Sequence, residues 1–195
     1  MRKTLLLAVL SLPLLAFDCG GGDSQPAPGG FGCSLEVRGA VSEDLWCIVT
    51  AYDYSAMPTM PTNEWVFLLV AYRGQPVAGG ALPDPAAQVG FFLTGRPALS
   101  QPYGWSTTAS TVDSGSATRG TGSVQAGTYA ETHEALAPLD PLDPSSGTGA
   151  LATRFTAIPA AAATGAQLLG VHGTLEGTLP ALDAGGAPVT IRATF

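Results

Sequence analysis

The chain has 195 residues, of which 25 are glycine and 16 are proline, and only 12% are charged. Eight basic and fifteen acidic side chains give a net charge of −7, which argues against a nucleic-acid-binding protein because such proteins contact phosphates through lysine and arginine. Hydrophobic residues make up 46% of the chain, so this is not the composition of a disordered protein.

The first residues have the pattern of an export signal. Arg2 and Lys3 give a basic start, and an apolar run follows from Leu5 to Phe17. This run is too short for a helix to cross the hydrocarbon core of a bilayer, which takes about 20 residues. Residues 1–18 are therefore predicted to be a secretory signal peptide.

The segment around Cys19 resembles the lipobox region of bacterial secreted lipoproteins. Leu14–Ala16 lie just before Cys19 and a glycine run follows it, although the family has a small residue where this chain has Asp18. The resemblance implies that Cys19 carries a lipid and anchors the protein to a membrane of the cell envelope. Residues 19–32, rich in glycine and proline, are then a flexible tether. Cleavage after Ala16 by an ordinary signal peptidase is the alternative, and it would give a secreted protein.

Three cysteines are present, at positions 19, 33 and 47. If Cys19 carries lipid, Cys33 and Cys47 remain, and an exported protein is expected to join them as a disulfide. Such a bond would close a loop of about 15 residues and add roughly 3 kcal/mol of stability. No Cys-x-x-Cys pair indicates a zinc or redox site, and no cofactor is predicted.

From Cys33 onward, short runs that alternate apolar and polar residues, or that are rich in β-branched and aromatic residues, predict strands. The run 65–72 is almost wholly apolar, so it is expected to be a central strand covered on both faces. Residues 130–137 are expected to form one or two helical turns before Pro138. The full set of expected strands is 33–38, 46–54, 65–72, 89–94, 103–109, 122–132, 149–158, 168–179 and 189–195.

Breaks that contain glycine and proline separate these runs, and no internal repeat or second domain boundary follows the tether. Short strands with such turns predict an all-β fold. We expect residues 33–195 to form one domain, a single antiparallel β-sandwich or a small closed barrel.

The two histidines are the first candidates for chemistry. His133 lies between Glu131 and Glu134, which suits a metal ligand or a general base, but a solvated polar cluster is the favoured interpretation. His172 and Glu176 alternate with apolar residues on one strand, so imidazole and carboxylate share a face. They could be a ligand pair or a base with its orienting acid, and an outward polar face is the favoured alternative.

Aromatic side chains give the other candidate site. Tyr103 and Trp105 are two residues apart, so they share a strand face and could stack against a sugar or another flat ligand. Packing in the core is the favoured interpretation, because a β domain needs most of its aromatic residues there.

The end of the chain resembles the C-terminal signature of outer-membrane β-barrel proteins, with a period-two strand that ends at Phe195. The resemblance covers about seven residues, and Phe195 is instead expected to plug the core.

The sequence is therefore compatible with three alternative functions. The first is a lipid-anchored envelope protein with a binding or structural role, whose partner is a protein or a small molecule. The second is an extracytoplasmic hydrolase or metal-dependent enzyme that uses His172 and Glu176, or His133. The third is a small outer-membrane barrel, which requires a continuous apolar belt around its outside.

Overall fold

The computed structural model describes residues 32–54, 64–75, 84–121, 130–137, 149–160, 167–168, 170–182 and 185–195. The predicted signal peptide, most of the tether and Cys19 lie outside these ranges. No helix in the described ranges could cross a membrane. The strands are β1 (Gly32–Gly39), β2 (Glu43–Asp53), β3 (Glu64–Tyr72), β4 (Ala87–Thr94), β5 (Pro102–Trp105), β6 (Ser114–Thr121), β7 (Ala130–Leu136), β8 (Ala150–Ala157), β9 (Gln167–Leu168), β10 (His172–Leu179) and β11 (Val189–Thr194).

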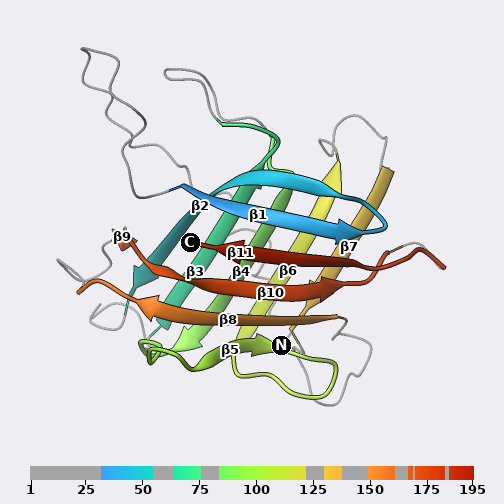
Figure 1. The fold of residues 1–195 in the computed structure, drawn as a ribbon. Coiled ribbons are helices and arrows are strands. Elements are labelled where there is room, and N and C mark those ends of the chain that lie inside the picture. The colour runs from blue at the N-terminus through green and yellow to red at the C-terminus, as the bar shows by residue number, and fades with distance from the viewer. Residues whose placement is uncertain are drawn as a thin grey trace, which may run out of the picture.

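All of these strands belong to one antiparallel sheet, in the order β5-β8-β10-β11-β1-β2-β3-β4-β6-β7, with β9 beside β2. The sheet is so strongly curled that β1, β11, β10 and β8 cross in front of β3, β4 and β6 (Figure 1). The all-β prediction is confirmed. The architecture is one continuous half-barrel, where two packed sheets or a closed barrel were expected. Alternation along a strand specifies only that one face is buried, and both a curled sheet and a sandwich bury one face.

Both ends of the sheet are covered by nearby backbone. Beside β7, the amide of Glu134 donates to the carbonyl of Pro180 at 3.1 Å, and the amide of Leu182 donates to Thr132 at 3.0 Å. Beside β5, the amide of Thr111 donates to the carbonyl of Gly104 at 2.8 Å. These bonds occupy backbone groups that would otherwise pair with another chain.

The concave side of the curl holds the hydrophobic core. Phe67 of β3 lies at its centre, with ring-centroid distances of 4.9 Å to Phe91 on β4 and 5.5 Å to Phe155 on β8. The ring of Phe195 packs 5.4 Å from Phe67, as the core-plug interpretation predicts. These rings join the two halves of the sheet across the interior.

Strands β1 and β2 carry the predicted disulfide between Cys33 and Cys47. The two residues are direct partners in the β1–β2 register, their Cα atoms are 4.8 Å apart, and both side chains are buried. Beyond Ile48, β2 no longer pairs with β1 and pairs with β9 through Ala51 and Tyr52. The disulfide therefore lies where β2 leaves the front half of the sheet.

The local structure differs from the expectations in three places. Residues 130–136 form strand β7 instead of helical turns, because pairing with β6 turns His133 and Ala135 into the interior. Strand β6 was not expected at all, since its sequence of small residues, SGSATRGT, has no hydrophobic alternation. Strand β3 is central, but Val66, Leu68 and Val70 on its outer side are partly exposed, so it is not fully covered on both faces.

Candidate functional site

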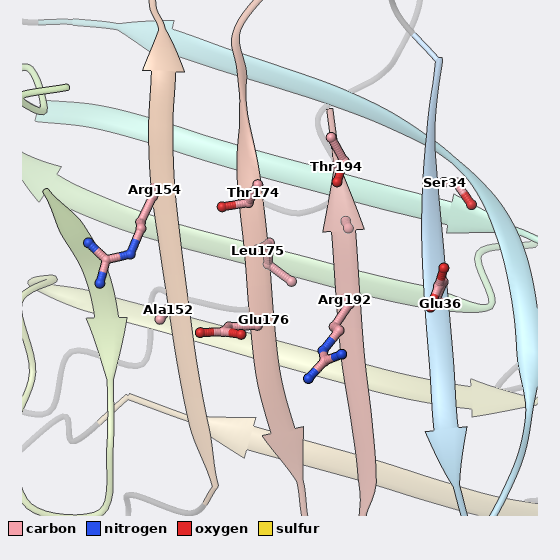
Figure 2. Close-up of a pocket in the computed structure, with 10 residues that line it drawn as sticks. Ser34, Glu36, Ala152, Arg154, Thr174, Leu175, Glu176, Arg192 and Thr194 are labelled. Atoms are coloured by element: carbon pink, nitrogen blue, oxygen red, sulfur yellow. The ribbon is translucent and has the colours of Figure 1, made fainter. Parts of the chain in front are cut away.

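A polar surface covers the outer side of β1, β11, β10 and β8. The strand registers arrange its side chains in two rows. One row is Glu36, Arg192, Glu176 and Ala152, and the other is Ser34, Thr194, Thr174 and Arg154. We call these eight residues the polar face, and Figure 2 shows them with the groove that they line.

The alternation of each strand produces this surface. On β10, Thr174 and Glu176 are exposed, whereas Leu175 between them is 2% exposed. Leu175 and Ala193 form the floor of the groove, which is shallow and has a volume of about 570 Å³. The polar side chains therefore stand on a rigid base of buried residues.

Charges alternate across the first row. Arg192 lies between Glu36 and Glu176 in the registers of the two neighbouring strands. Side chains directly opposite each other in antiparallel strands have Cβ atoms about 5 Å apart, so each carboxylate is within reach of the guanidinium. In the second row, Arg154 donates from Nη1 to the carbonyl of Ser100 at 3.2 Å.

Arg38 extends the charged row at the β1 end. Its Nη2 lies 2.6 Å from Oδ1 of Asp44 and 3.7 Å from Oε2 of Glu36. The hydrogen bond to Asp44 raises the pKa of the Arg38 guanidinium above its ordinary value. Glu36 therefore has a positive group on the same strand as well as Arg192 on the next strand.

This arrangement offers hydrogen-bond donors and acceptors side by side on an open surface. Guanidinium groups donate, carboxylates accept, and the hydroxyls of Ser34, Thr174 and Thr194 can do both. In the described part of the chain, no three His, Cys, Asp or Glu side chains converge as a metal site would require. The geometry suits recognition of a polar partner.

Of the residues predicted from the sequence, Glu176 belongs to the polar face. His172 is exposed at the start of β10, but it is separated from Glu176 by an irregularity in the β8–β10 register and does not line the groove. The outward polar interpretation of this strand agrees with these positions.

Tyr103 and Trp105 both pack toward the core. Trp105 is 4% exposed, and the Tyr103 ring lies 6.0 Å from that of Phe155. The hydroxyl of Tyr103 accepts a hydrogen bond from the amide of Ala98 at 2.7 Å. A buried indole offers no open ring face to a ligand, so the pair does not form a surface platform.

His133 is buried, which corrects the expected solvated cluster. The side chain is 1% exposed, and its Nε2 lies 3.2 Å from the carbonyl of Ala187. Its Nδ1 has no hydrogen-bond partner among the described groups. The sequence suggested solvent exposure because glutamates flank His133, but on a strand the adjacent Glu134 points to the side opposite His133.

An ion pair that was not predicted from the sequence lies inside the curl. Arg119 on β6 lies opposite His133 in the β6–β7 register, is 2% exposed, and binds the carboxylate of Glu43 through Nη2. Arg73 also approaches Glu43, at 3.3 Å. Alternation of Ala117 and Arg119 on the inward side of β6 was the available signal, but β6 itself was not recognised.

The two histidines are far from each other. His133 forms an isolated β-bridge with Ala181. Ala181 is nine residues along the chain from His172, and nine residues of extended strand span about 30 Å.

No family model, curated protein or solved structure matches the chain.

Proposed function

We propose that the chain is an exported, lipid-anchored protein of the cell envelope that acts by binding a polar partner through the polar face. The observation that carries this proposal is the ordered pair of rows around Arg192, with Glu36 and Glu176 on either side. A regular array of donors and acceptors on a rigid sheet recognises a partner without reorganising, which reduces the entropic cost of binding. The partner is a protein or a small molecule rich in hydrogen-bonding groups.

The enzyme alternative receives less support from the geometry. His133 is in the interior on β7, whereas His172 is on the outside of β10. A general base or a metal site needs its groups in one place, within hydrogen-bonding or coordination distance.

The membrane-barrel alternative also receives less support. The outward positions of Glu36, Arg192 and Glu176 interrupt the continuous apolar belt that a membrane barrel requires.

The anchor is tested by mass spectrometry of the mature N-terminus. The expected result for the wild type is a lipid-sized mass on Cys19, and for Cys19→Ala the loss of that mass and release from membranes. An unmodified chain that begins at Phe17 would show that the protein is secreted.

The polar face is tested by site-specific photo-crosslinking in cells that produce the full chain. A photoreactive residue at Thr194 is expected to give one discrete adduct, because Thr194 lies beside Arg192 in the groove. The adduct should disappear when Arg192→Glu is added. The matched control is Thr118, which is on the outer side of β6 and away from the polar face. Equal adducts at both positions, or none at Thr194, would contradict the proposal.

A further inference from the structure

The outer side of β2, β3 and β4 is largely apolar, with Thr50 and Gln88 as uncharged polar residues on it. Ile48 and Tyr52 on β2 are register partners of Val70 and Val66 on β3, and Phe92 on β4 lies opposite Val66. Trp46 on β2 and Leu68 on β3 lie on the same side, next to Ile48 and Val70 along their strands. All seven apolar side chains are partly exposed, and we call them the apolar face. Charged side chains on this side occur only toward the ends of β2 and β3, at Asp44 and Glu64.

The two outer surfaces of the half-barrel therefore differ in character. The polar face lies on β1, β11, β10 and β8, which cross in front in Figure 1, and most of the apolar face lies on β3, β4 and the later part of β2 behind them. The two faces meet at the β1–β2 pairing, where Ser34 is the register partner of Trp46. Because the front and back strands pack against each other through their inner sides, the outer sides of β8 and β10 point away from those of β3 and β4. A protein with one apolar side and one polar side is oriented when it meets a boundary between lipid and water.

The size of the apolar face helps to identify its occupant. Three strands at about 4.8 Å and six residues at about 3.3 Å give a patch of about 280 Å². A stable protein interface buries about 800 Å² on each partner, so a second copy would bury only a third of that area. The patch is sufficient for a weak contact that something else holds in place.

A lipid anchor would supply that additional hold. The chain between Cys19 and Gly32 reaches at most about 45 Å, which keeps the domain beside the bilayer. Gly32 begins β1 and is the register partner of Ile48, a member of the apolar face. The tether therefore enters the fold at the edge of this surface, where it borders Ser34 of the polar face. A tethered surface needs only weak affinity, because the anchor makes docking intramolecular.

The side chains fit a membrane boundary. Tryptophan and tyrosine are enriched where hydrocarbon meets water, because their rings are apolar and their polar groups can remain hydrated. Trp46 and Tyr52 lie near the two ends of the face, with Ile48, Thr50 and the aliphatic residues of β3 between them. We propose that the apolar face docks on the surface of the membrane that holds the Cys19 lipid, so that the polar face points into the aqueous space. This inference rests on the proposed lipid anchor.

Trp46 is a built-in probe for the test. The chain has three tryptophans, and Trp65 and Trp105 are 0% and 4% exposed, so lipid can reach only Trp46. Full-length lipidated protein is reconstituted into phosphatidylcholine vesicles, with and without bromine on the acyl chains. We expect brominated lipid to quench part of the tryptophan emission, and we expect Trp46→Phe to abolish that quenching.

A charge introduced into the apolar face should release it. Leu68→Glu is expected to lose the quenching while the protein still floats with the vesicles. Thr174→Glu adds the same charge on the polar face and should keep full quenching. Added salt should have little effect on quenching, because the acidic chain has no electrostatic attraction to lipid.

The outcomes separate the inference from the anchor on which it rests. A chain that does not float with vesicles would overturn both. Flotation without quenching of Trp46 would overturn the docking and leave the anchor intact. A cross-linked dimer that Leu68→Glu abolishes, with no quenching by brominated lipid, would assign the face to a second copy of the chain.

Discussion

Arg119 on β6 binds the carboxylate of Glu43 on β2 across the inside of the curled sheet, although 76 residues separate them. In the sheet, β6 is three places from β2, so the ion pair spans the curl instead of joining neighbouring strands. The side chain of Arg119 is 2% exposed and that of Glu43 is 20% exposed, whereas Arg73 on the outer side of the same carboxylate is 46% exposed. Glu43 thus has one buried and one solvated cationic partner.

Glu43→Gln is expected to lower the free energy of unfolding by about 3 kcal/mol, because the buried guanidinium of Arg119 loses its ion pair with Glu43. Arg73→Gln breaks only the solvated pair and is expected to cost less than about 1 kcal/mol. Urea denaturation of both variants measures the difference. Equal losses would mean that solvent screens Glu43 from Arg119 as effectively as from Arg73.

The strands that contain large apolar residues could be predicted, because alternation along β1, β2, β4 and β11 needs no knowledge of their neighbours. The curl could not be predicted. It depends on pairings between distant parts of the chain, such as Ser34 with Thr194 at opposite ends of the domain. Residues 130–136 contain Ala, Glu and Leu, which favour helices, but pairing with β6 overrides that propensity.

In the candidate site, too, only the features that depend on local sequence could be predicted. Glu176 was recognised because the alternation on β10 is local. Its row partners Arg192 and Glu36 were not recognised, because they join it only when β11 and β1 lie in register beside β10. The ion pair of Glu43 with Arg119 required the curl as well as the registers, so no local pattern indicated it.

Gly115 on β6 is expected not to tolerate a side chain. A Cβ atom there would lie 2.8 Å from Cβ of Phe91 and 2.8 Å from Cζ3 of Trp105, both of which are buried. Gly115→Ala should therefore lower the free energy of unfolding by about 1–3 kcal/mol through overpacking.

Gly90 on the adjacent strand β4 is the matched control, since a Cβ there would meet atoms only at 3.6 Å. Gly90→Ala should raise the free energy of unfolding by about 0.5–1 kcal/mol, because alanine loses less backbone entropy on folding. Thermal unfolding followed by circular dichroism distinguishes the two, and a loss at Gly90 similar to that at Gly115 would refute the steric argument.

Removing the disulfide should destabilise the fold. Cys33 and Cys47 are 14 residues apart, so the bond restricts a short loop of the unfolded chain. The double variant Cys33→Ala and Cys47→Ala is expected to lose about 3 kcal/mol. Cys19→Ala removes the cysteine of the predicted lipobox, which is not part of this bond, and should leave the free energy of unfolding unchanged. Reductant should destabilise the wild type and have no effect on the double variant. A wild type that is insensitive to reductant would indicate that the bond contributes nothing to stability.

Ionisation of the buried Tyr72 hydroxyl is expected to lower the stability of the folded protein in alkali. Its side chain is 2% exposed and its ring lies 6.0 Å from that of Trp46, and burial raises the pKa of its hydroxyl above the ordinary value of 10.0. The folded protein therefore retains a proton that the unfolded chain releases. This contribution to stability is complete below pH 10.0 and decreases as the pH rises from 10.0 through the raised pKa of the folded state.

Tyr72→Phe has no hydroxyl to ionise, so its free energy of unfolding should fall less steeply above pH 10.0 than that of the wild type. Tyr54, whose pKa is raised by burial and by the charge of Tyr52, should contribute a second and separate part of the alkaline slope. Urea unfolding at a series of pH values measures these slopes, and identical slopes for the wild type and Tyr72→Phe would show that the Tyr72 hydroxyl reaches solvent in the folded protein.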